Sequence, residues 1–239
     1  MTAPRVEVQP DAAALATAVA GELLSRLADA QAAGHVPQIA LTGGGIAEAV
    51  HRELARLSPG SGVDWARVVV WWGDERFVAR DSADRNAKGA REAFLDSVGA
   101  TQVHEMPSTD DAADVDAAAT AYSTTVREHG ADEFDVVMLG LGPDGHVASL
   151  FPGHPALDDA GIAVGVTGSP KPPPERVSLT FAALNRARSV WFLVSGEQKA
   201  TAVAAALAPD GDLHDIPARG VTGGEETIWF LDQQAASRL

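Results

Sequence analysis

Continuous apolar runs alternate with amphipathic segments along this chain, and this alternation constrains the fold more than any other feature. Residues 68–72 and 134–141 are two such runs. Strands of a parallel sheet are buried on both faces and carry runs of this kind, whereas strands with one solvated face alternate apolar and polar residues. We therefore predict strands at 5–8, 38–42, 68–72, 134–141, 162–166, 177–180, 190–195 and 227–231.

Helical patterns lie between these strands. They are predicted at residues 11–33, 46–57, 86–98, 112–128 and 197–207. A strand that is followed by a helix implies a crossover connection to a parallel strand. The chain has 239 residues, and α/β folds of roughly 200 to 250 residues commonly form one unit. We predict an α/β fold in a single domain spanning residues 1–239, with a mainly parallel sheet covered by helices on both faces.

The composition excludes several classes of protein. With 46% hydrophobic residues the chain can bury a large core, and its net charge of −15 would repel a nucleic acid backbone. Charged residues interrupt the alanine-rich segment 11–33, so this segment predicts an amphipathic helix and not a signal peptide or membrane span. Cysteine is absent, which rules out disulfides and thiolate metal sites and agrees with the cytoplasmic location that we expect.

The segment 139–153, LGLGPDGHVASLFPG, carries the strongest candidate for catalysis. It begins in an apolar strand, passes through a glycine-rich turn and places His146 at the carboxyl end of that strand. Ligands of open α/β sheets bind at this edge, and an imidazole with its ordinary pKa of about 6.5 exchanges protons near neutral pH. We predict that His146 is a general base. The alternative is a turn residue bonded to backbone carbonyls.

A second strand end carries a glycine turn. Thr42, Gly43, Gly44 and Gly45 connect the strand at 38–42 to the following helix. Without side chains the backbone can approach a ligand closely, and the N-terminus of the helix offers free N–H donors. The segment predicts a phosphate cradle, although a plain tight turn is the alternative. It matches neither the P-loop nor the GxGxxG dinucleotide pattern.

Three charged residues leave the strand at 68–72 together. They are Asp74, Glu75 and Arg76. A guanidinium binds phosphate or carboxylate with two parallel hydrogen bonds, so we predict that Arg76 binds an anion. Asp74 would orient a histidine or a sugar hydroxyl. A surface cluster of salt bridges is the alternative.

Three more cations are candidates for anion binding. The proline-rich segment 168–175, GSPKPPPE, is extended, and it is either a linker or a rigid arm that presents Lys171. Arg176 follows it directly, and Lys199 lies at the start of the helix predicted at 197–207. A solvated lysine is the alternative reading of Lys199.

Taken together, these motifs resemble the 6-phosphogluconolactonase family. The matching segments are LTGGG at 41–45, WGDERFV at 72–78 with Asn86 downstream, LGLGPDGHVASLFPG at 139–153 and VWFLVSGEQKA at 190–200. The resemblance covers nearly the whole chain, and DGHVASLFPG is its most specific part. It implies the modified Rossmann-like fold of the hexosamine-6-phosphate isomerase superfamily. One departure is Ile46 with Ala47, where the family often carries Ser and Thr, so Thr42 or backbone N–H groups would have to replace a hydroxyl donor.

The resemblance also implies a reaction. It is the hydrolysis of 6-phospho-D-glucono-1,5-lactone to 6-phospho-D-gluconate in the oxidative branch of the pentose phosphate pathway. His146 would activate water and then protonate the departing ring oxygen. The resemblance suggests a phosphate cradle made of Thr42, Gly43, Gly44, Arg76 and Lys171. Lys199 matches a phosphate-binding lysine of the related deaminases. Arg176 would also bind the phosphate if the proline arm folds inward.

The residues leave two assignments open. Asp74 or Asp144 would orient the imidazole of His146, and we rank Asp74 first. Backbone N–H groups near Gly142 and Gly145, or Arg76, would stabilise the oxyanion.

Two other functions stay open as well. One is a hexosamine-6-phosphate deaminase or isomerase that uses Asp74 to move a proton, and the other is a non-catalytic sugar-phosphate sensor. The related deaminases carry an aromatic residue at the position of Arg76 and lack the continuation at 149–153, which favours the lactonase. We expect no metal, because the histidines form no HxH or HExxH spacing, and we expect no cofactor. The oligomeric state is not determined by the sequence, with a monomer slightly favoured.

Overall fold

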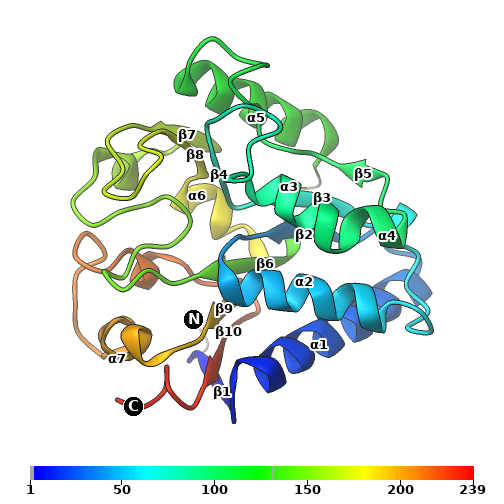
Figure 1. Cartoon of the computed structure of the whole chain (residues 1–239). Helices are drawn as coiled ribbons and strands as arrows, with labels where there is room; N and C mark the ends of the chain where they lie inside the picture. Colours follow the sequence, from blue (N-terminus) through cyan, green and yellow to red (C-terminus); the bar gives the residue numbers. More distant parts are fainter. Residues whose placement is uncertain (1–2, 131) are drawn as a thin grey trace.

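A parallel sheet of seven strands forms the centre of the molecule in the computed structural model, which describes residues 3–130 and 132–239 (Figure 1). The strand order is β1-β10-β9-β6-β2-β3-β5, and every neighbouring pair is parallel. The strands are β1 (Arg5–Gln9), β2 (Gln38–Leu41), β3 (Val69–Trp72), β5 (Gln102–Val103), β6 (Phe134–Gly140), β9 (Ala187–Val194) and β10 (Glu226–Asp232).

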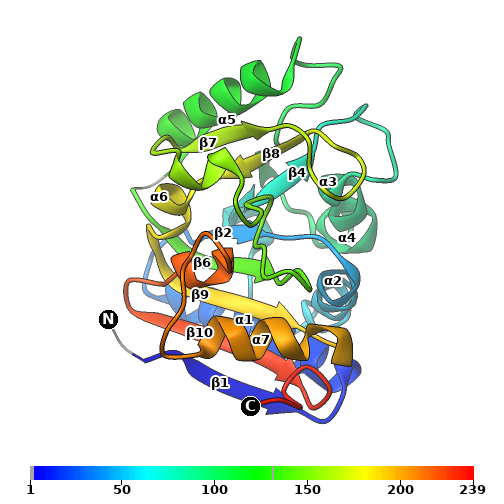
Figure 2. The same ribbon diagram turned by 90° about the vertical axis from the view of Figure 1, so that its left-hand side faces the viewer.

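Helices cover both faces of this sheet. In Figure 2, α7 lies on one side of β9 and β10, and α1 lies on the other. The helices are α1 (Ala12–Ala32), α2 (Gly45–Leu57), α3 (Asn86–Ala90), α4 (Asp96–Val98), α5 (Val115–His129), α6 (Phe181–Leu184) and α7 (Ala200–Leu207). A π-helical turn at Arg91–Leu95 joins α3 to α4, so the helix predicted at 86–98 is continuous. The predicted α/β class with a mainly parallel sheet is confirmed.

A second, antiparallel sheet was not predicted. It contains β4 (Asp74–Arg76), β8 (Arg176–Leu179) and β7 (Ala163–Val166) in that order. Strand β4 consists of three charged residues, so no apolar run marks it. The chain passes between the sheets at Gly73, whose N–H donates to the Leu41 carbonyl at 2.9 Å while its own carbonyl accepts from the Leu179 N–H at 2.8 Å.

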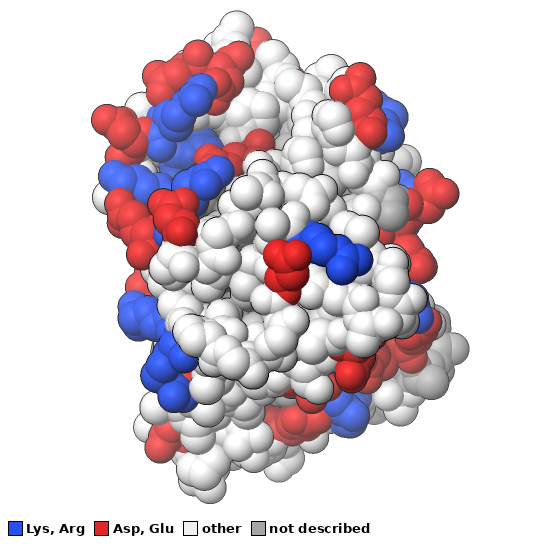
Figure 3. All heavy atoms as spheres, turned by 90° about the vertical axis from the view of Figure 1, so that its right-hand side faces the viewer, with Lys and Arg blue, Asp and Glu red and all other residues white. Residues whose placement is uncertain are grey.

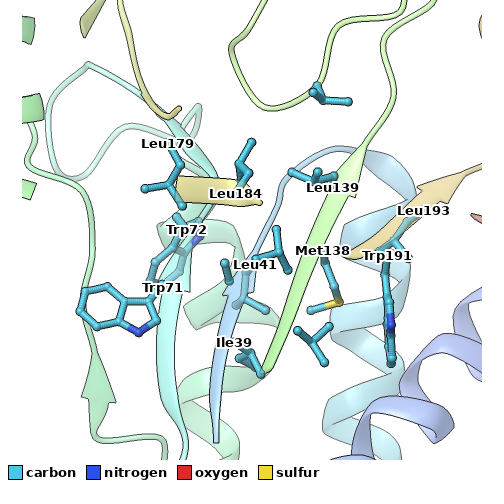
Figure 4. Packing of buried hydrophobic residues seen from close by; sticks show 14 of the residues in the cluster. Ile39, Leu41, Trp71, Trp72, Met138, Leu139, Leu179, Leu184, Trp191 and Leu193 are labelled. Carbon is cyan, nitrogen blue, oxygen red and sulfur yellow. The ribbon is translucent and has the colours of Figure 1, made fainter. Parts of the chain in front are cut away.

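The hydrophobic core extends across both sheets. All four residues of β2 and of β3 are buried, which explains the continuous apolar runs of these strands. Figure 4 shows side chains of β2, β3, β6 and β9 packed together, with Leu179 and Leu184 close to Trp72. All five tryptophans are at most 3% exposed, so they belong to the core and do not offer stacking platforms.

Charges of both signs lie on the surface. On the face shown in Figure 3, many basic side chains lie beside acidic ones, and one such pair lies near the centre of the face among uncharged residues. Within the described part of the chain, no helix is long and apolar enough to cross a membrane.

One histidine is buried in the core. His51 of α2 is 3% exposed, its ring lies 5.1 Å from that of Phe94, and its Nδ1 has no hydrogen-bond partner among the described residues. Burial, with a smaller contribution from the positive charge of Arg52, lowers the pKa of His51 to about 4. The ring is therefore neutral in the folded protein near neutral pH.

This burial predicts a pH-dependent stability. Between pH 6.5 and 4 the unfolded chain protonates His51 but the folded chain does not, so acidification lowers the free energy of unfolding, by about 3 kcal/mol in total. Above pH 6.5 both states are neutral and this contribution vanishes. We expect His51→Phe, which keeps an aromatic ring beside Phe94, to remove this part of the slope. Urea unfolding at pH 7.5, 6 and 5 tests it, and equal slopes for the two proteins would contradict it.

Candidate active site

A cavity of about 530 Å³ opens at the carboxyl ends of the central strands. Strands β2 and β6 are neighbours there, and the chain continues from them toward opposite edges of the sheet. Open α/β sheets bind ligands at such a reversal of strand order. The cavity is lined by Thr42, Gly43, Gly44, Gly45, Asp74, Arg76, His146, Lys171, Arg176 and Lys199, which are all of the predicted site residues, together with others that include Ile46, Asn86, Phe151 and Gln198.

His146 reaches the cavity through a tight loop after β6. The Gly145 N–H donates to the Gly142 carbonyl at 3.0 Å, and the Gly142 N–H donates to the His146 carbonyl at 2.8 Å. Gly145 has a φ of +84°, a left-handed conformation that favours glycine. The loop therefore turns back on itself and places the imidazole over Gly142.

The backbone of Gly142 leaves the space in which the imidazole lies. A Cβ at this position would lie 2.0 Å from His146 Nδ1 and 2.3 Å from Asp144 Oδ1. The N–H groups of Gly142 and Gly145 themselves donate to backbone carbonyls, so neither of these two is available to an oxyanion. Arg76 and the other N–H groups near these glycines stay candidates for the oxyanion site.

Asp144 pairs with the imidazole. Its Oδ1 lies 2.5 Å from His146 Nδ1, whereas the carboxylate of Asp74 accepts a hydrogen bond from Ser149. The ranking of Asp74 above Asp144 as the residue that orients His146 is therefore wrong. An aspartate two residues away reaches the ring because the loop closes on itself, which residue spacing alone does not reveal.

Asp144 is negatively charged beside the imidazole of His146. Burial raises the pKa of Asp144, but the hydrogen bond and the electrostatic attraction of His146 outweigh it and lower this pKa to about 2. A carboxylate only accepts hydrogen bonds, so Nδ1 of His146 carries a proton and Nε2 keeps its lone pair when the ring is neutral. The Phe151 ring, 4.6 Å away between centroids, packs against the imidazole.

Strand β4 brings two charged side chains into the same cavity. Asp74 and Arg76 share one face of the strand because side chains alternate along it, and Glu75 points to the other face. Asn86 holds both: its Oδ1 accepts from Arg76 Nη1 and its Nδ2 donates to the Asp74 carbonyl at 2.9 Å. A Cβ on Gly43 would lie 1.8 Å from Asn86 Oδ1, so the glycine turn also makes room for this amide.

Glu75 anchors the loop between β4 and α3. Its carboxylate accepts backbone N–H bonds from Arg76, Asn86 and Ala87 at 2.7–2.9 Å, so it lies at the N-terminus of α3. Arg85, with an almost fully buried side chain, lies 3.9 Å away. Burial raises the pKa of Glu75, although Arg85 and the three N–H donors act in the opposite direction. This carboxylate is structural and fixes Arg76 and Asn86 at the cavity.

The glycine turn supplies backbone donors. Gly44 has a φ of +97° and precedes α2, and its missing side chain leaves the first N–H groups of that helix without a side-chain cap. Ile46 lines the cavity and brings no hydroxyl, whereas Thr42 is 5% exposed at the end of β2. These features suit an anion, because the N-terminus of a helix carries partial positive charge.

Two lysines approach the cavity from different segments. Lys199 Nζ donates to the Leu141 carbonyl at 2.6 Å, and Lys171 lies in the loop between β7 and β8. Burial and repulsion by Lys171 lower the pKa of Lys199, while Asp144 acts in the opposite direction. The two ammonium groups are thus close enough to repel each other, and an anion between them would relieve this repulsion.

Arg176 holds the proline loop. Its Nε donates to the Pro173 carbonyl at 2.8 Å, and its Nη2 donates to the carbonyls of Lys171 and Pro172 at 3.1 and 3.2 Å. These hydrogen bonds hold the segment 168–175 in one conformation at the cavity wall, so the segment is a rigid arm and not a flexible linker. Arg176 also lines the cavity, but three of its hydrogen bonds serve the backbone of this arm.

Sequence reasoning missed some of the site. Asn86, Ser149 and Gln198 were not proposed as site residues, although Asn86 and Gln198 line the cavity and Ser149 bonds Asp74. Ser149 follows His146 within the most specific motif, which was the available signal. Over the described ranges 3–130 and 132–239, no group of three or more histidines and carboxylates is arranged to hold a metal ion.

Known proteins resemble this chain over nearly its whole length. A profile of the family described as glucosamine-6-phosphate isomerases/6-phosphogluconolactonase matches residues 10–229. The 6-phosphogluconolactonase of Streptomyces coelicolor is 42% identical over 99% of this chain and 95% of its own, and that of Mycobacterium leprae is 43% identical over 98% of each. The solved structure of 6-phosphogluconolactonase from Trypanosoma brucei is 26% identical and covers both chains fully, with a TM-score of 0.86.

The packing at Gly142 predicts the effect of a methyl group. In Gly142→Ala the new Cβ would displace His146 and Asp144, and such overpacking lowers the free energy of unfolding by about 1–3 kcal/mol. The matched control is Gly89→Ala, because no atom lies within 4 Å of a Cβ at this helical position, and there we expect a gain of up to about 1 kcal/mol. Urea unfolding and the NMR signal of the His146 ring measure both effects. An unchanged imidazole signal in Gly142→Ala would contradict the packing.

Proposed function

Because the chain belongs to the family of glucosamine-6-phosphate isomerases and 6-phosphogluconolactonases, we propose that it hydrolyses 6-phospho-D-glucono-1,5-lactone to 6-phospho-D-gluconate. The observation that carries the proposal is the hydrogen-bonded pair of Asp144 and His146 in a cavity that also contains the glycine turn and the cations. This reaction would place the protein in the oxidative branch of the pentose phosphate pathway.

His146 acts as the general base in this mechanism. Its Nε2 takes a proton from a water molecule, whose oxygen attacks C1 of the lactone and forms a tetrahedral intermediate. The imidazolium then returns the proton to the ring oxygen as the bond between C1 and that oxygen breaks. Such proton transfer typically contributes about 10² to 10⁴ in rate. The products are a carboxylic acid, which ionises at neutral pH, and a free hydroxyl group.

Asp144 keeps the imidazole ready for this step. By accepting from Nδ1 it fixes the tautomer in which Nε2 carries the lone pair, and its negative charge stabilises the imidazolium that forms. Its lowered pKa keeps the carboxylate ionised throughout the neutral range. Arg76, held by Asn86, is our candidate for the positive charge beside the developing oxyanion or the phosphate.

The phosphate group positions the substrate. The first turn of α2 with Gly43, Gly44 and Gly45 offers N–H donors, and Thr42, Lys171 and Lys199 add a hydroxyl and two ammonium groups. Arg176 contributes by bracing the arm that carries Lys171. This local positive field attracts an anion although the whole chain carries a net charge of −15.

A second candidate is a hexosamine-6-phosphate deaminase or isomerase. The observation that favours it is Asp74, a carboxylate that lines the same cavity and could move a proton between neighbouring carbons. Release of ammonia from glucosamine 6-phosphate would identify this activity. A sensor without turnover is the third reading, and it predicts ligand-dependent stabilisation with no lactone hydrolysis above the buffer rate.

Removal of the base tests the mechanism. We expect His146→Ala to lower kcat by about 10²- to 10⁴-fold on freshly generated lactone, after the rate in buffer is subtracted. His35→Gln is the matched control, since His35 is exposed and pairs with Asp135 near the amino end of β6. Retained activity in His146→Ala would exclude His146 as the base.

Removal of a lysine tests the phosphate site. We expect Lys171→Ala to raise KM for the phosphorylated lactone about 10- to 100-fold, because one charge-assisted hydrogen bond is lost, with a much smaller change in kcat. D-glucono-1,5-lactone, which lacks the phosphate, should be hydrolysed equally by the variant and the wild type. A similar loss on both lactones would show that Lys171 does not act on the phosphate.

A further inference from the structure

A buried hydrogen bond connects the motif that carries His146 to strand β4. Ser149 Oγ donates to Asp74 Oδ2 at 2.7 Å, and the two residues are 0% and 7% exposed. Asp74 lines the cavity, whereas Ser149 lies behind it. The serine therefore contacts the carboxylate from the protein side and leaves its other side toward the space where a ligand would bind.

Ser149 is itself fixed by the second sheet. Its backbone N–H donates to Ser178 Oγ at 3.2 Å, and the Ser178 hydroxyl donates to the Leu179 carbonyl at 3.0 Å. Ser178 is the partner of Asp74 in the antiparallel register of β4 and β8. Ser149 thus takes its position from the same strand pair that holds Asp74.

The turn after His146 has an uncommon conformation. The Leu150 N–H donates to the Val147 carbonyl at 2.9 Å, which closes a turn with Ala148 and Ser149 at its centre. Ala148 has a φ of +48°, in the left-handed region that residues with a Cβ rarely adopt. Such conformations persist where the surrounding structure fixes them, often at functional sites. Here the turn brings the Ser149 hydroxyl to Asp74 three residues after the imidazole.

We propose that Ser149 is a positioning residue, whose hydroxyl fixes the Asp74 carboxylate so that Oδ1 accepts a hydrogen bond from a ring hydroxyl of the sugar-phosphate lactone. The inference rests on the function proposed above and adds a residue to it. Each carboxylate oxygen is an acceptor, so the bond from Ser149 to Oδ2 leaves Oδ1 available. Asn86 donates to the Asp74 backbone carbonyl, and the hydrogen bond from Ser149 to Oδ2 restrains the orientation of the carboxylate. An acceptor that is oriented in advance requires little reorganisation when the substrate binds.

A double-mutant cycle tests whether Ser149 acts through Asp74. We expect Ser149→Ala to lower kcat/KM about 10- to 100-fold, the range for a misoriented charged hydrogen-bond partner. Asp74→Asn should lower it at least as much, and the double variant should match Asp74→Asn within about 2-fold, because no carboxylate is left to orient. Losses that multiply in the double variant would overturn the proposal, as would full activity in Ser149→Ala.

Control variants separate the positioning role of Ser149 from a purely structural role. Ser149→Ala keeps the N–H that bonds Ser178, so the main anchor of the turn is retained. Ser123→Ala is the control, because it removes another buried serine hydroxyl that lies outside the cavity lining. This hydroxyl accepts a hydrogen bond from the Ala163 N–H at 3.1 Å. We expect Ser123→Ala to keep kcat/KM within about 2-fold of the wild type. If Ser149→Ala does not fold, Ser149→Cys keeps a weak donor of similar size, and it should show an intermediate loss that also disappears in the Asp74→Asn background.

The substrate side of the contact is tested with deoxy lactones. Phosphorylated lactones that lack the hydroxyl at C2, C3 or C4 each remove one possible donor to Asp74. For one of the three, the ratio of wild-type to Ser149→Ala kcat/KM should fall to about one, while it stays at about 10 to 100 for the other two. The same ratio for all three lactones would overturn the assignment of Asp74 to a ring hydroxyl.

Binding of the product separates this inference from the proposed activity. If the wild type does not hydrolyse the lactone above the buffer rate, the proposed function fails, and calorimetry with 6-phosphogluconate then tests Ser149 without turnover. 6-Phosphogluconate keeps the hydroxyl groups at C2, C3 and C4 on an open chain, so one of them can still donate to Asp74. We expect Ser149→Ala to bind 6-phosphogluconate about 10-fold more weakly, and to have no further effect in the Asp74→Asn background. Equal affinity of wild type and Ser149→Ala would overturn the positioning role.

Discussion

The imidazole of His146 packs directly on the backbone of Gly142, and the position of the other site residues depends on close approaches of this kind. A Cβ on Gly142 would lie 2.0 Å from the ring, and one on Gly43 would lie 1.8 Å from the amide of Asn86. Asn86 in turn holds Arg76 and the backbone of Asp74. The absence of two side chains thus lets the base, a carboxylate and a guanidinium share one cavity. Because packed interiors do not deform freely, small changes at these glycines should reach the whole site.

Two sheets contribute to this cavity for different reasons. The parallel sheet places the glycine turn after β2 and the histidine loop after β6 at neighbouring strand ends. The small antiparallel sheet then adds Asp74, Arg76 and the arm with Lys171 from the side. Since Gly73 bonds to both sheets, it fixes the position at which the charged strand β4 leaves the apolar strand β3. The site therefore combines backbone donors from one layer with charged side chains from the other.

The charged residues at the cavity differ in what they contact. Glu75 is turned away from the cavity and accepts the first N–H groups of α3, whereas Asp144 is paired with the base and its pKa is lowered. Arg176, which the sequence suggested as a phosphate ligand, gives three hydrogen bonds to the arm that carries Lys171. Charged residues that look equivalent in the sequence thus divide into those that mainly hold the backbone of the site and those whose charge is directed to the cavity.

The sequence alone determined the class of fold, eight of the strands and the long helices. Central strands that are buried on both faces carry continuous apolar runs, and helices that are buried on one face carry apolar residues at helical spacing. It also indicated His146, the glycine turn and the cations, because each lies at the end of a predicted strand, shortly after one, or in the proline arm or next to it. Only the tertiary structure assigned Asp144 to the imidazole, Ser149 to Asp74 and the two N–H groups of the histidine loop to carbonyls. These are choices between partners of similar chemistry, and such choices depend on distances of a few ångströms that are set by how the loops close and how the two sheets pack.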